Sequence, residues 1–405
     1  MVLRITLLII CVLTCNQFSV AQNIKAKAGV LDARGWDPQR KLALNGEWAY
    51  FPNTLRSGPA DNSTFVEFPH MWNNGQGYAT YRLQVLLPRD NSKIAISLPQ
   101  IYSAYSFIAN GQEVATNGKI GANKGSTVPQ WRPQTVTLPD VRDTLELVLT
   151  IANFQHYVGG IREPIFIGEA EKMLSEFSQS RLFELIEFGA LTLIGFGFLI
   201  MFLIGERKKV IVYFALFCFS WAIRSMFSNQ YVFIHYFPSF NWWAMIRIEY
   251  IMLYLTMIWA MLFLGRLFVR DVNAILKYLL VGGNVLFVAI TLLAAPVLFT
   301  SLLNVYLTFA ALILLYGVVV VLIALINGRP GSLALTISTV LGAGVFVYDI
   351  LSYKGFFMFN QAVFSVGYIL IFLFMGLALL YFLNILKSKL GQSDKLTYED
   401  FFGKN

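Results

Sequence analysis

The chain has 405 residues and is too apolar for an average soluble protein. Hydrophobic residues make up 57% of it, against roughly 45–50% in soluble domains, and its mean hydropathy is +0.60. The formal net charge of +8 does not indicate nucleic-acid binding, because residues 23–181 carry sixteen basic and fourteen acidic residues and no basic stripe. The three histidines are scattered without metal-ligand spacing, so neither a metal nor a cofactor is expected.

Residues 1–21 are predicted to be a cleavable signal peptide. Arg4 gives a cationic start, residues 5–13 form an apolar run, and Ser19-Val20-Ala21 supplies a small-residue cleavage site. Lipidation at Cys15 is the alternative. The residues that follow are expected to be exported.

Residues 22–178 are predicted to form an extracytoplasmic, all-β jelly-roll sandwich that acts as a sensor domain. Short strand-like segments are separated by turn residues, and they lie at residues 79–87, 93–98, 103–109, 135–138, 144–152 and 164–168. Asn110-Gly111 is a strong hairpin signal after one of them. Several short strands at this spacing favour an antiparallel sandwich. Residues 169–180 are polar without Pro or Gly and predict a helical connector.

Residues 183–386 are predicted to form an all-α bundle of seven transmembrane helices. Each apolar stretch is close to the ~20 residues that a helix needs to cross a bilayer. We expect spans at about 183–204, 210–228, 242–264, 275–295, 302–326, 332–351 and 363–386. An odd number of spans places the two ends of the chain on opposite sides.

The loop charges predict the orientation of the spans. Eleven basic residues fall on one side: Arg207, Lys208, Lys209, Arg266, Arg270, Lys277, Arg329, Lys387, Lys389, Lys395 and Lys404. The opposite loops contain only Lys354. Because cytoplasmic loops carry the excess of Lys and Arg, the β domain is expected outside the inner (plasma) membrane and residues 387–405 are expected to be a short cytoplasmic tail.

The loops on the predicted outer side are rich in aromatic residues. Those between spans two and three are Tyr231, Phe233, Tyr236, Phe237, Phe240, Trp242 and Trp243. An aromatic belt at the membrane interface is one interpretation. The other is a docking surface for the β domain.

Several ionisable residues fall in the outer half of the predicted spans. They are Arg224, Arg247, Glu249, Asp349, Glu187 and Glu184. Such residues cost several kcal/mol in a bilayer unless they are paired or hydrated, so they are functional candidates. One hypothesis is a buried charge network in which Arg224 pairs with Glu249 or Asp349. The alternative for the residues near span ends, including Glu187, is that they reach water and pair with nothing.

Short motifs in the β region carry a family resemblance. They are LNGEW at 44–48, FPHMW at 68–72, ATYR at 79–82 and FIANG at 107–111. In this order they resemble the jelly-roll sugar-binding domain at the N-terminus of beta-galactosidases and beta-glucuronidases. Together with residues 153–168 and seven spans, they resemble the bacterial seven-transmembrane receptors with diverse intracellular signalling modules (7TMR-DISM). Members usually carry a kinase, cyclase or transcription-factor module after the last span. This sequence stops about twenty residues after it. The expectation is output through a cytoplasmic signalling protein in trans, and the alternative is an effector module that follows this sequence.

The resemblance also implies a carbohydrate site built from aromatic faces and a few polar groups. The candidates are Trp72, Tyr102, Trp131, Arg132, His156 and Arg162. In its motif Trp72 more often packs in the core, and His156 is equally compatible with a structural hydrogen-bonding role. Arg132 and Arg162 could hold a carboxylate, which would favour an acidic sugar or an organic acid.

A receptor in the lipid bilayer that senses a carbohydrate or another small ligand is therefore the expected function, and nucleic acid is not an expected partner. The alternative is a transporter or channel with an extracytoplasmic substrate-binding domain. The odd number of spans and the lack of an evident inverted repeat disfavour it. Retinal binding would need a lysine in the last span, which has none before Lys387. An enzyme is not expected, because the outer region lacks a convincing carboxylate pair for glycoside cleavage.

Overall fold

The computed structural model describes residues 24–55, 63–72, 75–88, 93–139, 143–205, 207–353 and 360–391. The predicted signal peptide and residues 392–405 of the predicted tail lie outside these ranges. The chain divides into two compact units, which we describe separately. Unit 1 comprises Met1–Arg181, Asn229–Ala244 and Pro296–Ser301, and unit 2 comprises Leu182–Ser228, Met245–Ala295 and Leu302–Asn405. Two segments that lie between membrane spans in the sequence therefore belong to unit 1.

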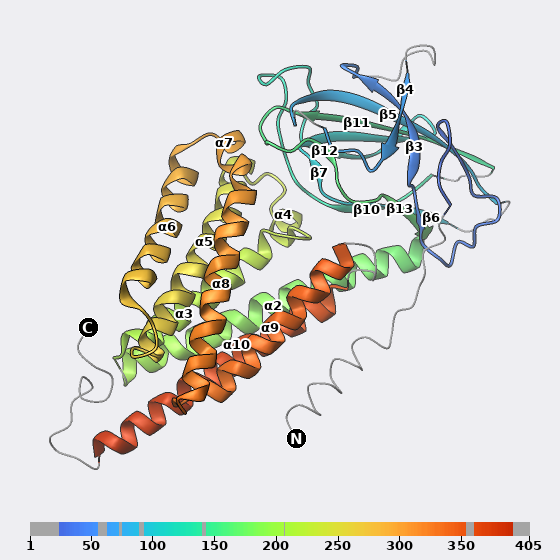
Figure 1. Cartoon of the computed structure of the whole chain (residues 1–405). Helices are drawn as coiled ribbons and strands as arrows, with labels where there is room; N and C mark the ends of the chain where they lie inside the picture. The colour runs from blue at the N-terminus through green and yellow to red at the C-terminus, as the bar shows by residue number, and fades with distance from the viewer. Residues whose placement is uncertain are drawn as a thin grey trace. The chain divides into compact units, whose positions relative to one another are not determined.

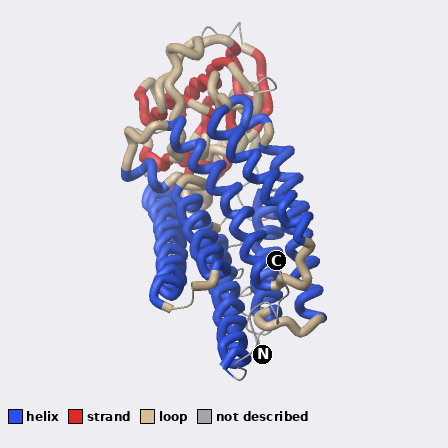
Figure 2. Tube along the Cα trace, turned by 90° about the vertical axis from the view of Figure 1, so that its left-hand side faces the viewer, coloured by secondary structure: helices blue, strands red, loops and turns tan. Residues whose placement is uncertain are grey.

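Unit 1 contains the strands of the molecule (Figures 1 and 2). They are β1 Val30–Asp32, β2 Leu42–Ala43, β3 Gly46–Pro52, β4 Thr64–Phe68, β5 Gly77–Leu86, β6 Ile94–Leu98, β7 Ile101–Tyr102, β8 Ala104–Ala109, β9 Gln112–Asn117, β10 Gln134–Thr137, β11 Thr144–Asn153, β12 Gly160–Ile161 and β13 Phe166–Glu169. One sheet has the order β4-β3-β5-β11-β8-β9 with β1 beside β5, a second has the order β10-β6-β13-β2, and β12 pairs with β7. The all-β fold class predicted for this region is confirmed.

The core of unit 1 follows from the two-residue period of its central strands. Tyr81, Leu83 and Val85 of β5 are fully buried, while Arg82 between them is exposed. The alternation arises because successive side chains in a strand point to opposite faces. Each buried aliphatic side chain contributes about 1.5–3 kcal/mol relative to exposure. On the exposed face, Arg82 forms a 2.6 Å ion pair with Glu146 of the neighbouring strand.

The predicted hairpin at Asn110-Gly111 is confirmed. These two residues join β8 to β9 and have φ angles of 48° and 78°. Asn and Gly tolerate positive φ better than other residues, and a turn of this kind matches the twist of the strands. Asn110 Oδ1 also accepts a hydrogen bond from the main-chain N–H of Glu146 at 2.8 Å, so the turn is tied to β11.

The described residues include seven helices that are long and apolar enough to cross a membrane, as predicted. They are α2 Ala170–Ile204, α3 Lys209–Met226, α5 Trp242–Leu267, α6 Ala274–Leu293, α8 Leu303–Ile326, α9 Ser332–Tyr353 and α10 Gln361–Gly391. The predicted connector and the first span form one helix, α2. Two short helices that the sequence did not predict, α4 Val232–Tyr236 and α7 Pro296–Ser301, belong to the segments of unit 1 between spans.

Unit 2 has its own apolar core. Phe214 and Phe263 are fully buried with ring centroids 5.3 Å apart, and Leu379 of α10 belongs to the same cluster. A polar clamp joins two of its connections. Arg329, in the turn after α8, donates from Nε and Nη2 to the carboxylate of Asp271 at 2.8 and 3.0 Å. The hydrogen bond to Asp271 raises the pKa of Arg329 above its ordinary value.

Candidate functional site

Three predicted ligand residues form one buried aromatic cluster in unit 1. Tyr102 and His156 stack with their ring centroids 4.9 Å apart, and Trp131 meets them edge-on at 5.6 and 5.2 Å. Trp131 is 2% exposed and His156 is 4% exposed. The pairing of β7 with β12 brings Tyr102 close to His156. The main-chain N–H of Gln130 donates to the carbonyl of Ser103 at 3.1 Å, next to Trp131.

His156 is held in place by its neighbours in the chain. Its main-chain N–H donates to Asn153 Oδ1 at 3.1 Å, and its Nδ1 lies 3.0 Å from the main-chain nitrogen of Val158. Burial lowers the pKa of His156 to about 4. The imidazole is therefore neutral at neutral pH, as expected for the structural hydrogen-bonding role that its sequence context also allowed.

Trp72 lies apart from this cluster. Its Nε1 donates to the hydroxyl of Tyr81 at 2.7 Å, and its ring packs against the core of the sandwich. His70 Nδ1 lies 2.9 Å from the same hydroxyl. Trp72 is itself half-buried, so it packs against the core from its edge and bonds to the fully buried Tyr81.

The segment Asn229–Ala244 packs directly on this cluster. Trp131 contacts Tyr231 and Trp242 with centroid distances of 5.7 and 5.4 Å. Tyr231 and Trp242 are 2% and 3% exposed, so the docking interpretation of the aromatic loop is confirmed for these two residues. Tyr236 and Phe237 are exposed, as residues of an interfacial belt would be.

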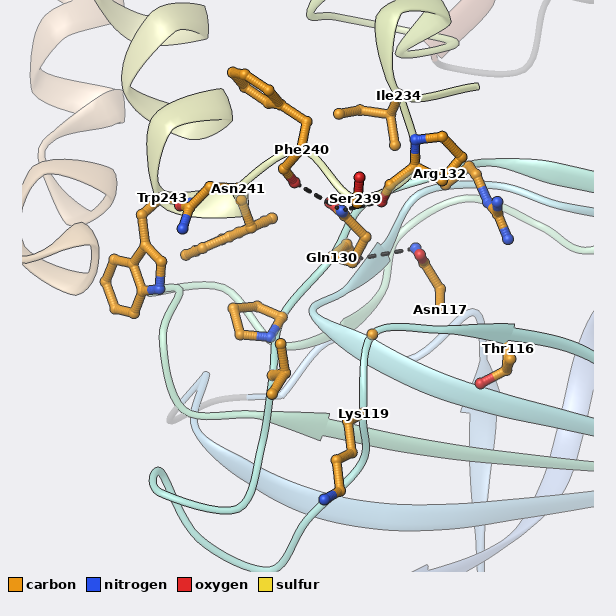
Figure 3. Close-up of a pocket in the computed structure, with 15 residues that line it drawn as sticks. Thr116, Asn117, Lys119, Gln130, Arg132, Ile234, Ser239, Phe240, Asn241 and Trp243 are labelled. Atoms are coloured by element: carbon orange, nitrogen blue, oxygen red, sulfur yellow. Dashed lines mark hydrogen bonds between the residues drawn. The ribbon is translucent and has the colours of Figure 1, made fainter. Parts of the chain in front are cut away.

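Hydrogen bonds fix the same segment to the β domain. Gln130 Nε2 donates to the main-chain carbonyls of Pro238 and Phe240, both at 3.2 Å (Figure 3). The second inter-span segment is tied in a similar way, because Thr300 Oγ1 accepts from the main-chain N–H of Tyr157 at 3.1 Å. Unit 1 thus contains two segments that are contiguous in sequence with membrane spans.

A pocket of about 580 Å³ opens beside these contacts. The lining residues come from the end of β9, the segment before β10 and the inter-span segment Asn229–Ala244, and those labelled in Figure 3 are Thr116, Asn117, Lys119, Gln130, Arg132, Ile234, Ser239, Phe240, Asn241 and Trp243. The other lining residues include Trp242. The pocket therefore combines amide groups, two cations and aromatic faces.

Of the two predicted arginines, only Arg132 lies at the pocket. It is half-buried, and its Nη2 donates to Gln134 Oε1 at 3.3 Å. Arg162 is exposed and is not one of the lining residues, although it lies within electrostatic range of His156. The two guanidinium groups are therefore not brought together at this pocket, in contrast to the paired carboxylate grip that was hypothesised.

The sequence did not single out Gln130, Asn117 or Lys119. None of them belongs to a recognisable motif, and their place at the pocket depends on the fold between β9 and β10. The opposite wall of the pocket contains Phe240 and Trp243. The sequence indicated it only by the many aromatic residues around the start of α5.

The predicted intramembrane charges lie in unit 2. Arg224 Nη1 donates to the main-chain carbonyl of Glu249 at 3.1 Å, and Arg247 Nη2 donates to that of Ala294 at 3.0 Å. Both cations thus donate hydrogen bonds to main-chain carbonyls. A carbonyl oxygen has two lone pairs, so it can accept such a bond in addition to the one within its helix.

The acidic members of this set divide into two kinds. Glu184 and Glu187 are each 1% exposed, so the expectation that they reach water is wrong. Glu187 Oε1 instead accepts a hydrogen bond from Trp221 Nε1 at 3.0 Å, which explains how its carboxyl group can be buried. Asp349 is exposed on α9. Tyr368 lies within electrostatic range of Glu187, Arg224 and Asp349.

These observations define the class of the protein: a multi-pass membrane protein with seven apolar helices and an all-β domain. The model of the family described as 7TM diverse intracellular signalling matches residues 180–381. The chain belongs to this family, as the sequence resemblance predicted. Family membership and the seven spans support a receptor-like role in signalling.

The β domain is similar to parts of larger solved structures. They include a GH2 beta-galacturonidase from Eisenbergiella tayi (15% identity, TM-score 0.25, 33% of this chain and 25% of that chain). A beta-glucuronidase from Bacteroides uniformis gives 15% identity and a TM-score of 0.26, over 32% of this chain and 17% of that chain. The chain spans about a quarter of the length of these structures or less. No curated protein matches the chain.

Proposed function

We propose that this protein is an inner-membrane receptor that binds a small extracytoplasmic ligand, a carbohydrate, in the pocket of unit 1. The seven spans pass the ligand state to a cytoplasmic signalling protein. Residues 22–178 are the sensor domain, residues 183–386 the transmembrane domain and residues 387–405 the cytoplasmic tail.

The proposal is supported by the segments that form the two walls of the pocket. One wall belongs to the β domain, and the other belongs to Asn229–Ala244, which leads directly into α5. A ligand that contacts Gln130 and Phe240 would therefore touch both walls at the same time. Because Trp242 and Trp243 begin α5, a shift of this wall alters the first turn of a membrane span.

The charge distribution supports the orientation. Eleven cations flank the spans on the side of residues 387–405, and one lies on the other side. In this orientation the pocket faces the outside, where a nutrient or cell-wall saccharide would arrive, and the Arg329–Asp271 clamp faces the cytoplasm.

Hydrogen–deuterium exchange on the full chain in nanodiscs tests the binding site. We would add glucose, galactose, glucuronate and galacturonate singly, and we expect at least one of them to slow exchange in Asn229–Ala244. Gln130→Ala should remove this protection. Gln84→Ala, at an exposed position of β5, is the matched control and should keep it. Protection confined to other parts of unit 1 would contradict the assignment of the pocket.

Two further measurements separate receptor from transporter. Uptake of a bound saccharide into proteoliposomes would favour the transporter alternative over a receptor. Cross-linking from Arg207→Cys, at an exposed position between α2 and α3, should capture a cytoplasmic signalling protein in native membranes, whereas a cysteine placed at the exposed outer residue Tyr236 should not.

A further inference from the structure

The pocket of unit 1 has a positively charged lining. Lys119 and Arg132 are the charged residues among its lining residues, all of which lie in the described part of the chain, and no Asp or Glu is among them. Figure 3 shows the two cations at separate edges of the pocket, with Asn117 between them in this view. The pocket therefore offers two cations and several amide donors to a single ligand.

The positive charge of Arg132 is not matched by an ion pair within the described residues. Its hydrogen bond at Nη2 goes to the neutral amide oxygen of Gln134, and its Nε is buried without an acceptor in the described structure. A buried guanidinium N–H that lacks an acceptor is unfavourable, because the group has given up water without a replacement. A ligand oxygen would supply one.

A second buried donor belongs to the opposite wall. Trp242, also a lining residue, has a buried Nε1–H for which the described residues provide no acceptor. The two walls of the pocket thus each carry an N–H group in need of an oxygen atom. Indole N–H groups donate and do not accept, so a cationic ligand group could not satisfy Trp242.

The pKa of His235, next to the pocket, is affected by positive charges, Arg132 among them. His235 follows the lining residue Ile234, and burial lowers its pKa to about 4, with Arg181 and Arg132 lowering it further. The imidazole is neutral at neutral pH, so it adds no charge of its own. Arg181 and Arg132 therefore both contribute positive potential at His235.

We infer that this pocket binds an oxyanion, a carboxylate or phosphate group that accepts from Arg132 and lies in the field of Lys119, with the rest of the ligand against Phe240 and Trp243. The inference rests on the proposed function, since it names the ligand class of the same site. Arg132 is the specificity-determining residue, because its fork of N–H groups matches an oxyanion and a neutral sugar offers no charged acceptor. The oxyanion can belong to an acidic sugar in solution or to the headgroup of an anionic lipid, because Trp242 and Trp243 begin a membrane span.

Matched ligand pairs test the charge requirement. Calorimetric titration of the full chain in phosphatidylcholine nanodiscs would compare glucuronate with glucose and galacturonate with galactose. We expect the acid of at least one pair to bind about tenfold or more tightly than its neutral partner. Its affinity should fall as salt rises. A second arm compares the thermal stability of the protein in nanodiscs with and without phosphatidylglycerol, which detects a lipid source.

Four variants make the result specific. Arg132→Gln should abolish the preference for the acid, or the stabilisation by phosphatidylglycerol, and Arg132→Lys should keep part of it. Lys119→Gln, at an exposed position, should weaken the acid several-fold and covers the case in which Arg132→Gln does not fold. Arg34→Gln removes a charge that is paired with Asp32 elsewhere in unit 1 and should change neither.

The outcomes distinguish this inference from the proposed function. Equal binding of acid and neutral sugar, with both weakened by Gln130→Ala, would overturn the oxyanion assignment and leave the ligand pocket in place. Binding of no probe together with no effect of phosphatidylglycerol overturns the oxyanion assignment. An acid preference that survives in both Arg132→Gln and Lys119→Gln also overturns it.

Discussion

The indole rings of Trp131 and Trp242 meet at 90° with their centroids 5.4 Å apart, although 111 positions separate them in the sequence. One belongs to the β domain and the other to the first turn of α5. Edge-to-face contacts of this kind are worth about 0.5–1.5 kcal/mol beyond the buried area. This contact therefore stabilises the packing of Asn229–Ala244 on the β domain.

Trp242→Ala should loosen this segment. Loss of a buried indole costs about 3–5 kcal/mol when the site does not collapse. We expect faster hydrogen exchange in Asn229–Ala244 and unchanged exchange in β5 and β11, measured on the full chain in nanodiscs. Equal acceleration in β5 and β11 would show that Trp242 supports the whole unit instead.

Gln130→Glu should weaken the packing of Asn229–Ala244 on the β domain without changing the size of the side chain. The substitution is nearly isosteric, but it places a carboxylate oxygen against the carbonyls of Pro238 and Phe240 in place of a donor. Loss of two hydrogen bonds at about 0.5–1.5 kcal/mol each, with added repulsion, predicts faster exchange in Asn229–Ala244 than Gln130→Ala gives. Gln84→Glu on the exposed face of β5 serves as control. The prediction fails if Gln130→Glu and Gln130→Ala behave alike.

Trp221→Phe should destabilise unit 2 by leaving the buried carboxyl group of Glu187 without its indole donor. The expected loss is about 1–3 kcal/mol, measured as thermal unfolding in nanodiscs. The phenyl ring can keep its packing on Tyr368, whose centroid lies 4.3 Å from that of Trp221. Trp259→Phe, at a residue that stacks on Tyr213, is the matched control. A loss no larger than that of the control would argue against the hydrogen bond as its cause.

The clamp between Arg329 and Asp271 should show coupling in a double-mutant cycle. The side chain of Asp271 is 3% exposed, so Arg329→Gln leaves its carboxylate buried without a charged partner. We expect a coupling energy of about 0.5–3 kcal/mol between Arg329→Gln and Asp271→Asn in thermal unfolding. Additive effects would show that the two residues act independently.

The free energy of unfolding of unit 1 should decrease as the pH falls, because His156 titrates. Burial lowers its pKa from 6.5 to about 4, so the unfolded chain takes up a proton before the folded chain does. The contribution of His156 is complete above pH 6.5 and is lost as the pH falls toward 4. The pKa difference corresponds to roughly 3 kcal/mol.

His156→Phe keeps the stacking on Tyr102 and removes the titrating group. The unfolding temperature of this variant should depend less on pH over the same range, with a residual slope from His235, whose pKa burial also lowers to about 4. An unchanged slope would place the pH dependence in other residues.

Local patterns predicted the elements better than the site. An apolar stretch of about 20 residues is a local property, so the spans, including α5 at Trp242, were predicted to within a few residues at most ends. The hairpin at Asn110-Gly111 was likewise encoded by two adjacent residues. The joining of the connector to the first span in one helix, α2, was missed because polar and apolar stretches were treated as separate elements.

The site depends on pairings that no local pattern reveals. Tyr102, Trp131 and His156 were each predicted, but their meeting depends on the pairing of β7 with β12 and on the hydrogen bond from Gln130 to Ser103. Trp72 is also an aromatic residue but packs against the edge of the core instead. The burial of Glu187 was also hidden, because its span is apolar on most sides and gives no sign of which face meets Trp221.

The attachment of Asn229–Ala244 to Trp131 has a consequence for modularity. Residues 22–178 read as a transplantable domain, yet excision at residue 178 would strip Tyr231 and Trp242 from the indole of Trp131 and open the pocket wall. A chimera that grafts this sensor onto another seven-helix bundle therefore needs to carry the inter-span segment with it. The β domain and the segment that packs on Trp131 are therefore encoded by two separate stretches of the gene.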